Sequence, residues 1–583
     1  MRLTHTPPSR FTAALTLSAL ALACSSALAQ TTPSAAQIQQ SDILLRQAQE
    51  RLKFEQERAQ RQQAPSGLDL KSVMPRVDAS QAKGNCHNVV SIDILGANLL
   101  DADDKSTLVN GLLGRCMGAA DIEKLMGAVT RHYIERGFIT TRAYLPAQDL
   151  ASGKLQLLVV EGRIESLRVE GDPDKRIDLG LAVPARAGDL LNMRDLEQAV
   201  DQINAVSANK VKLDLVPGTK PGQTAVVFRN QSGNPVSFEG SADNQGSEAT
   251  GKNGVSGTLT LGGVLGLNEN LALTYHTASP STGQAGNDGV SLGLTVPNGF
   301  GTYGVSASVS NYSIGLTTPG GRAMVAFGKS TSWSMTAERV TARDQDSRHA
   351  MVATLTSVDS KNYIDMGSMG TIFVNPTSRR ATTIAAGLKS TMLVGGGSFN
   401  LRPELALGLN EMGNLPAGVN ADSNGPQAEF TKATLDVSYE KHFDFSKQDW
   451  SWNSSFKGQV SADQLLSSQQ LLIGGIGSVR GFVTNSLSGD SGFYWRNELG
   501  LNHKVSLGDT RFTTKAYIGY DMGSVSNNAP GAASGGQMSG VVLGINAQFK
   551  AASIELSRTR GDKTPLGMTP EEAQTWLRIS FSL

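Results

Sequence analysis

The sequence predicts an all-β membrane barrel that follows two small α/β domains and one polar N-terminal helix. Three observations support this fold class. Residues 235–583 contain repeated segments in which apolar and polar residues alternate between turns, a pattern typical of barrel strands. Residues 86–234 contain two rounds of strand, helix and strand, each of about 75 residues. Residues 35–62 lack glycine and proline and are rich in helix-forming residues.

Length predicts the number of domains, and charge argues against a protein that binds nucleic acid. The chain has 583 residues, which predicts two or more domains. Its 52 basic residues are balanced by 52 acidic residues. Proteins that bind nucleic acid usually carry a basic surface, so we expect no nucleic-acid partner.

Residues 1–29 have the features of a secretory signal peptide. Arg2 and Arg10 precede a short, mostly apolar stretch at 11–24, and Ala27-Leu28-Ala29 forms an A-x-A cleavage site. A lipoprotein interpretation would instead use Cys24, although the residues before it match such a site weakly. No later run of 18 apolar residues exists, which excludes a transmembrane helix but leaves a barrel open. We therefore expect a mature chain that begins near Gln30.

Signal cleavage would leave two cysteines, Cys86 and Cys116. An even number of cysteines in an exported protein favours one disulfide. Two buried free thiols are the alternative. Together with the signal peptide, the pair indicates an oxidising compartment outside the cytoplasm.

The predicted N-terminal helix (30–63) carries only a thin apolar stripe. Such a polar helix buries little in an ordinary core and needs other surroundings. It is either a solvated, partly frayed helix or a plug inside the water-filled lumen of the barrel. Residues 64–85 contain two prolines and no periodicity, and this composition predicts an extended linker.

Residues 86–162 and 163–234 form the two predicted α/β domains. In the first, the helix 121–137 places Ile122, Leu125, Val129 and Tyr133 on one face and ends at a glycine. The strand-like segments are 89–96, 142–147 and 154–162 in the first domain, and 163–171, 211–218 and 223–230 in the second, around a helix at 193–206.

Residues 235–583 predict about 14–18 barrel strands, given the usual length of a strand and its connection. In the segment 510–521, Ile518 and Tyr520 share an apolar face while Lys515 and Asp521 share the polar one. The last segment alternates in the same way and ends on Leu583. An array of soluble β-sandwiches is the alternative, but it would not explain a chain that ends on a strand with an aromatic residue near its terminus.

Several motifs resemble the TpsB family of two-partner secretion transporters (the ShlB/FhaC/HecB type). The stretch 133–162 is similar to the first POTRA domain of that family, and 191–227 is similar to the second. The stretch GGIGSVRGFVTN (474–485) resembles the VRGF motif of the family's long loop, which folds into the barrel. The resemblance covers the whole mature chain and implies a barrel of about 16 antiparallel strands.

The motif places Arg480 between Val479, Gly481 and Phe482. A guanidinium in a confined lumen needs a carboxylate, preferably in a two-pronged pair. The resemblance supplies Asp521 within the G-x-D-x-G segment, between Gly519 and Gly523, and the alternation places the same residue on the polar face. A surface turn with a solvated ion pair is the alternative. Arg496 and Glu498 are further candidate lumen charges.

The resemblance implies an outer-membrane transporter of a Gram-negative bacterium, with its POTRA domains in the periplasm. Its partner would be a large TpsA-type exoprotein, such as an adhesin, a haemolysin or a contact-dependent toxin. Further expected partners are outer-membrane lipid, the barrel-assembly machinery and periplasmic chaperones. A barrel-assembly insertase is the alternative, although insertases usually carry more POTRA domains and no plug; a passive porin would not need the POTRA pair.

The sequence contains no motif that predicts catalysis or a cofactor. It has seven histidines, with no H-E-x-x-H or C-x-x-C metal motif. A phosphate-binding G-x-x-x-x-G-K-[ST] loop is also absent from the sequence. We therefore expect no enzyme, no metal and no cofactor.

Overall fold

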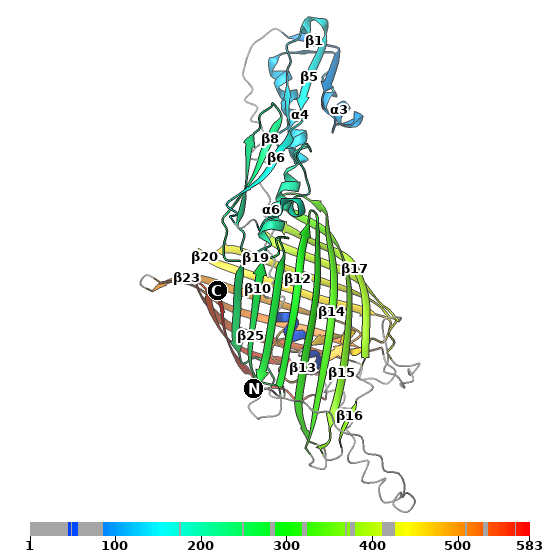
Figure 1. The fold of residues 1–583 in the computed structure, drawn as a ribbon, viewed down its shortest axis with the longest axis vertical. Helices are drawn as coiled ribbons and strands as arrows, with labels where there is room; N and C mark the ends of the chain where they lie inside the picture. The colour runs from blue at the N-terminus through cyan, green and yellow to red at the C-terminus, as the bar shows by residue number, and fades with distance from the viewer. Residues whose placement is uncertain are drawn as a thin grey trace, which may run out of the picture.

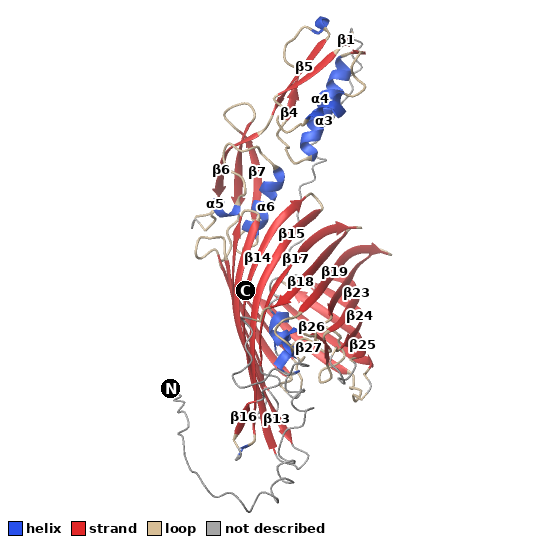
Figure 2. Ribbon diagram, turned by 90° about the vertical axis from the view of Figure 1, so that its right-hand side faces the viewer, coloured by secondary structure: helices blue, strands red, loops and turns tan. Residues whose placement is uncertain are grey.

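The computed structural model describes most of the chain and shows a barrel with two domains stacked at one end and a helix inside (Figures 1 and 2). The described residues are 43, 45–47, 49–55, 86–173, 176–247, 250–279, 286–317, 323–367, 370–373, 379–410, 426–507, 510–528, 535–565 and 567–583. The predicted signal peptide (1–29) and linker (64–85) lie outside them. No described helix is long and apolar enough to cross a membrane.

The first α/β domain (86–162) packs helices against a small sheet of order β2-β5-β4, in which β2 and β5 are parallel. Helix α4 buries Ile122, Leu125, Val129 and Tyr133, which confirms the predicted apolar face. Helix α3, by contrast, buries none of its residues, so the sequence carries no periodic signal for it. The elements are β1 (His87–Val89), β2 (Ser91–Leu95), α3 (Ala102–Val109), β3 (Arg115–Met117), α4 (Ala119–Glu135), β4 (Arg142–Tyr144), the 3-10 helix η2 (Leu150–Ser152) and β5 (Lys154–Val160).

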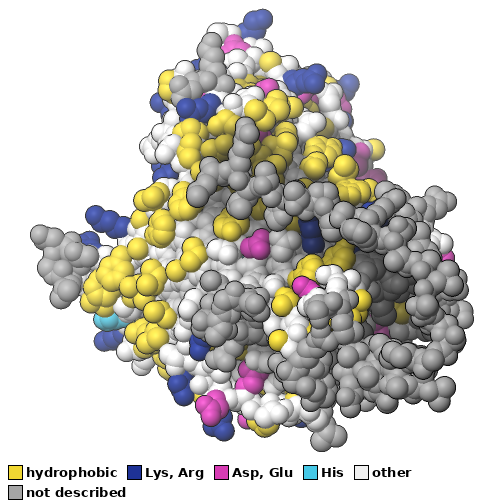
Figure 3. All heavy atoms as spheres, turned by 60° about the horizontal axis from the view of Figure 1, so that its bottom comes forward, with side chains coloured by type: hydrophobic (Ala, Val, Ile, Leu, Met, Phe, Trp, Pro, Cys, Tyr) yellow, Lys and Arg dark blue, Asp and Glu magenta, His cyan; other side chains and the backbone are white. Residues whose placement is uncertain are grey.

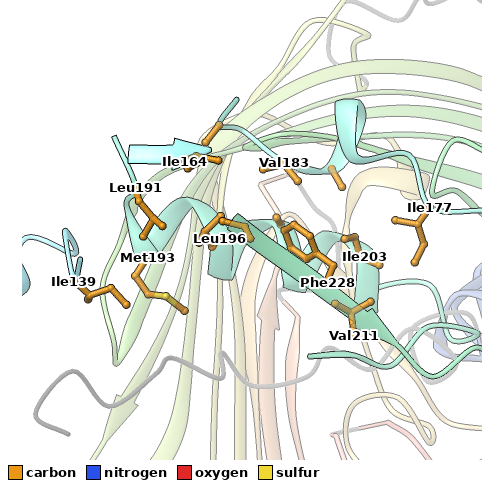
Figure 4. Close-up of a cluster of buried hydrophobic side chains, with 14 of the residues drawn as sticks. Ile139, Ile164, Ile177, Val183, Leu191, Met193, Leu196, Ile203, Val211 and Phe228 are labelled. Carbon is orange, nitrogen blue, oxygen red and sulfur yellow. The ribbon is translucent and has the colours of Figure 1, made fainter. Parts of the chain in front are cut away.

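The second α/β domain (163–234) has a sheet of order β6-β8-β7 covered by α6. Phe228 lies at the centre of its core, against Leu196 and Ile203 of α6 (Figure 4). The same cluster includes Ile134 and Ile139 of the first domain, so the two domains share buried surface. The elements are β6 (Arg163–Glu170), α5 (Leu179–Ala182), α6 (Met193–Asn204), β7 (Val211–Pro217) and β8 (Gln223–Asn230).

The rest of the described chain forms a closed antiparallel barrel of sixteen long strands, with the short β16 (Thr371–Phe373) as an extension beside β15. The long strands are β9 (Val236–Asp243), β10 (Asn253–Gly262), β11 (Asn270–Ser279), β12 (Gly286–Asn298), β13 (Gly301–Thr317), β14 (Ala323–Arg343), β15 (Ser347–Asp365), β17 (Arg379–Val394), β18 (Gly397–Gly408), β19 (Thr431–Phe445), β20 (Gln448–Ser461), β23 (Ser491–Leu507), β24 (Thr510–Ser526), β25 (Gly536–Phe549), β26 (Ala552–Lys563) and β27 (Gln574–Ser582). The barrel closes where β27 pairs with β9.

The two faces of the barrel wall differ as the alternation predicts. Ile518, Tyr520 and Phe581 are exposed on the outside, whereas Asp521 and Arg578, on the opposite faces of the same strands, are buried. Figure 3 shows the molecule obliquely, with the end opposite the α/β domains turned forward, and hydrophobic side chains form patches on the visible surface. Apolar side chains outside and polar side chains inside are the arrangement of a barrel in a lipid bilayer.

The second α/β domain is fixed to one rim of the barrel through α6. Gln202 donates hydrogen bonds to the carbonyls of Gly299, in the turn between β12 and β13, and of Gly301, the first residue of β13, each at 3.0 Å. Arg343, at the end of β14, donates to the Asp201 carboxylate at 2.6 Å. This rim therefore faces the α/β domains, and the connection between β20 and β23 lies at the other end of the barrel.

Candidate functional site in the barrel lumen

The motif loop (462–490) connects β20 to β23 and folds back into the barrel. It contains a 3-10 helix, η5 (Ser467–Gln469), and a hairpin of β21 (Leu471–Ile473) and β22 (Leu487–Gly489). Gly481 has a φ of 106°, and a Cβ there would lie 2.5 Å from the carbonyl carbon of Arg560 on β26. Only glycine fits this close approach of loop and wall.

Arg480 extends from the motif loop to two carboxylates on the inner wall. Its Nε and Nη2 donate to the two oxygens of Asp521 on β24, at 2.6 and 2.9 Å. Its backbone N–H donates to the same carboxylate at 3.0 Å, and its Nη1 donates to Glu498 on β23 at 3.0 Å. Arg480 is 7% exposed and Asp521 is 0% exposed, so the pair is shielded from water. Bidentate, buried and charge-assisted bonds of this kind are strong and directional.

Further charges extend this pair into a network. Lys515 donates to Glu498 at 2.7 Å, and Arg496 Nε lies 3.9 Å from Asp521. Arg496 also donates to the carbonyl of Gly477, which ties β23 to the loop a second time. The two lumen charges that the sequence left undecided, Arg496 and Glu498, therefore both join the network.

The other motif residues shape the space around the pair. Val479 and Phe482 are fully buried and pack in a cluster with Val525 and Met538 of the wall. A Cβ at Gly519 would lie 2.7 Å from Arg480 Nη2, and a Cβ at Gly523 would lie 3.1 Å from the Val479 side chain. Both glycines of the G-x-D-x-G segment thus leave room for the loop. The sequence pattern identified these positions but not this steric role.

Glu571 is a contact that sequence reasoning missed. It lies in the connection between β26 and β27, and its carboxylate accepts hydrogen bonds from three consecutive backbone N–H groups of the motif loop. The donors are Val483 at 2.8 Å, Thr484 at 3.1 Å and Asn485 at 2.6 Å. A carboxylate beside one other acidic residue, Glu572, in a connection between strands gives no sequence signal for such a contact.

The lumen helix (described residues 43, 45–47 and 49–55) lies inside the barrel, and Figures 1 and 2 show it surrounded by the strands. Leu45 is buried with Tyr312, Ile314 and further apolar residues of β13–β15. Arg46 donates to the carbonyl of Gln470 at 2.7 Å, and Gln47 donates to Ser486 at 3.2 Å. These bonds join the helix to the motif loop. Of the two alternatives for the polar helix, the described residues support the one inside the lumen.

Cys86 and Cys116 form a disulfide in the first α/β domain, with their Cα atoms 5.2 Å apart. The bond joins the start of that domain to β3 and is far from the lumen. Among the described residues, no group of three His, Cys, Asp or Glu side chains could hold a metal ion.

Comparisons with known proteins agree with this geometry. Residues 222–547 match the family described as haemolysin secretion/activation protein ShlB/FhaC/HecB. Residues 87–162 match the ShlB-type POTRA domain and residues 163–217 match a POTRA domain, so the two α/β domains are POTRA domains.

Similar proteins are outer-membrane transporters. The outer membrane transporter CdiB of Dickeya dadantii is 28% identical over 91% of this chain and 92% of its own length. The hemolysin transporter protein ShlB of Serratia marcescens is 28% identical over 87% and 88%. The solved structure of CdiB from Escherichia coli has a TM-score of 0.81 at 26% identity, over 93% of this chain and 98% of that one.

These relatives are transporters rather than enzymes. The barrel, the two POTRA domains and the matches together define an outer-membrane transporter of the two-partner secretion type, with its POTRA domains in the periplasm. The chain belongs to the ShlB/FhaC/HecB family of haemolysin secretion/activation proteins.

Proposed function

We propose that this transporter carries a large TpsA-type exoprotein, in an extended state, from the periplasm through the barrel to the cell surface. The observation that supports this most is the occupied lumen. The motif loop and the lumen helix occupy it and are joined to each other by polar contacts. A cavity of about 580 Å³ beside them is lined by charged side chains, among them Arg480, Glu498, Lys515 and Arg578. A polar path closed by movable elements suits the passage of an unfolded chain.

The first POTRA domain has a surface suited to capture of the exoprotein. Strand β2 lies at the edge of its sheet, and a groove of about 310 Å³ beside it is lined by Ile92, Ile94, Leu95, Lys105 and Val109. An extended peptide can pair with an exposed edge strand while its side chains enter such a groove. We therefore assign recognition of the exoprotein to this edge.

Transport then requires that the lumen helix leaves the barrel and that the motif loop rearranges. The sequence has no nucleotide-binding motif, so folding of the exoprotein outside the cell supplies the drive in this proposal. No catalytic step is assigned to the chain. Periplasmic chaperones would keep the exoprotein unfolded, and the barrel-assembly machinery would insert the transporter into the lipid of the outer membrane.

The test begins with deletion of the gene in its own host, followed by measurement of the exoprotein in the medium. Loss of the exoprotein from the medium, with other outer-membrane barrels assembled normally, is the expected result. If the exoprotein still leaves the cell while barrels in general fail to assemble, the chain is an insertase and the proposal is wrong.

A pair of matched variants tests the capture site. Leu95 lines the groove and is 46% exposed, whereas Leu113 of the same domain lies outside the groove and is 49% exposed. Leu95→Asp should reduce secretion at least tenfold, because it places a charge where apolar side chains would dock, and Leu113→Asp should leave secretion unchanged. Equal secretion by the two variants would show that the groove does not capture the exoprotein.

A further inference from the structure

The closure of the barrel, where its last strand meets its first, is the shortest interface between long neighbouring strands that the structure describes. The register of β27 with β9 runs from Arg578↔Asp243 to Ser582↔Glu239, and Phe238 and Leu583 exchange two further backbone hydrogen bonds at its end. The next interface, β9 with β10, runs from Asp243↔Gly254 to Val236↔Leu261. Side chains at the closure therefore carry more of its stability than they do elsewhere in the wall.

Arg578 lies across this closure and also reaches the lumen helix. From β27 it donates to Ser241 at 2.8 Å and to Asp243 at 3.2 Å, both on β9. Its Nη1 and Nη2 also donate to the two oxygens of Glu55 on the lumen helix, at 2.9 and 2.7 Å. The exposed fractions of these side chains are 4% for Arg578, 6% for Glu55 and 2% for Asp243.

A second arginine completes the cluster from the helix side. Arg51 lies one helical turn before Glu55, and its Nε is 3.3 Å from the Glu55 carboxylate. Its Nη2 pairs with Asp243 on β9. Two arginines and two carboxylates from three elements thus neutralise one another. Buried charges need partners, so removal of the helix leaves Arg578 and Asp243 with one charged partner each in place of two.

We propose that Arg578 is a positioning residue that fastens the lumen helix to the closure of the barrel. When the helix withdraws, Arg578 loses Glu55 and Asp243 loses Arg51. Of the contacts in this cluster, the closure then keeps the bonds from Arg578 to Asp243 and Ser241. Opening of the lumen and loosening of the closure are therefore coupled. This inference rests on the proposed role of the helix as a gate.

The test measures ion current through the full-length protein in planar lipid bilayers. Arg578→Met keeps the length of the side chain but removes its charge, and should raise the open fraction at least tenfold. Glu55→Gln should do the same from the helix side without changing the barrel wall. Arg558 is a matched control, because it is an exposed arginine on β26 that donates to Thr575 of β27. Arg558→Met should leave the open fraction unchanged.

A variant without residues 30–63 gives the largest open fraction that loss of the helix can produce. It separates the proposal that the helix closes the lumen from the proposal that Arg578 holds the helix in place. In that background Arg578→Met should not raise the open fraction further, because the contact it removes is already gone. The barrel without the helix should also unfold in detergent at a lower temperature than the full chain. The measurement is the temperature at which the gel band shifts from the folded to the unfolded position. Because Glu55→Gln alters only the helix, it still tests the contact between Arg578 and Glu55 if Arg578→Met does not assemble.

Two results would contradict the role of Arg578 and the role of the lumen helix separately. If the helix deletion opens the channel but Arg578→Met and Glu55→Gln both keep it closed, Arg578 does not hold the helix in place. The proposal that the helix closes the lumen would still be supported. If the helix deletion itself leaves the channel closed, the gate is wrong, and with it the proposed role of the helix in transport.

Discussion

Replacement of Arg480 by alanine should release the motif loop from the barrel wall. The change removes both guanidinium bonds to Asp521 and the bond to Glu498. Asp521, which is fully buried, would keep the backbone N–H of residue 480 and Arg496 at 3.9 Å. Loss of one partner of a buried ion pair costs about 3–5 kcal/mol. The population of displaced loop should therefore rise about 100- to 5000-fold.

The assay is the rate at which a cysteine at position 478 reacts with a maleimide in isolated outer membranes. Ser478 is 6% exposed in the folded loop, so Ser478→Cys should react slowly until the loop moves. The disulfide between Cys86 and Cys116 leaves those thiols unreactive. Arg380→Ala is the control, because Arg380 is 43% exposed and pairs with Asp359 at 3.0 Å. A pair of this kind contributes about 0–1 kcal/mol, so labelling should change less than about fivefold.

A wild-type labelling rate in Arg480→Ala, with the barrel assembled, would refute the reasoning. We also expect this variant to impair secretion more than assembly. From the sequence, reversal of both charges at 480 and 521 is expected to restore some activity. The structure changes that expectation, because a carboxylate at 480 would meet Glu498. Neutralisation by Arg480→Ala with Asp521→Asn should restore more, since it leaves no unpaired buried carboxylate.

Three further predictions concern the periplasmic part. Arg343→Met should free the second POTRA domain from the barrel rim, because Arg343 is 3% exposed and bonded to carboxylates of α6. The distribution of spin-label distances between that domain and the barrel should broaden. An unchanged distribution would contradict the role of Arg343 in docking. Cys86→Ser opens a loop with a sequence separation of 30 and should lower the stability of the first POTRA domain by about 3–4 kcal/mol, seen as proteolysis of that domain at lower urea concentrations. Burial and the nearby Asp189 raise the pKa of Asp195 from 3.8 to about 6, so folding disfavours its ionised form. This penalty is absent below pH about 4, grows between about 4 and 6 and is then constant. Asp195→Asn should therefore raise the urea midpoint of the second POTRA domain at pH 7.5 but not at pH 4.

Much of the architecture could be predicted because it depends on local patterns. The two-residue period fixes which face of a strand meets lipid, so Ile518 and Asp521 could be assigned to opposite sides from the sequence alone. The helix period identified the buried face of α4 in the same way. For Asp521, this parity and the family resemblance pointed independently to one residue.

The remaining features depend on contacts between distant parts of the chain. Glu571 and the loop N–H groups that it binds are more than 80 residues apart, and Glu55 and Arg578 are separated by 523 residues. No periodicity connects such positions, since they meet only when the barrel closes and the loop folds inward. Helix α3 was missed for a different reason: none of its residues is fully buried, and Leu108 and Val109 at its end are its apolar contacts with the core, too few to give a helical period.

The contacts that hold the motif loop differ from those that hold the lumen helix. This difference suggests the order in which the two elements move during transport. The motif loop is held by the buried pair of Arg480 and Asp521 and also by the fully buried side chains of Val479 and Phe482. The lumen helix buries Leu45 and Leu52, and its other contacts are the charged and polar ones, which water or a charged segment of the exoprotein can replace. We infer that the helix leaves first and takes with it the bonds from Arg46 and Gln47 to the loop. The loop would then face the lumen with fewer restraints, held to the wall by Arg480 and its carboxylates.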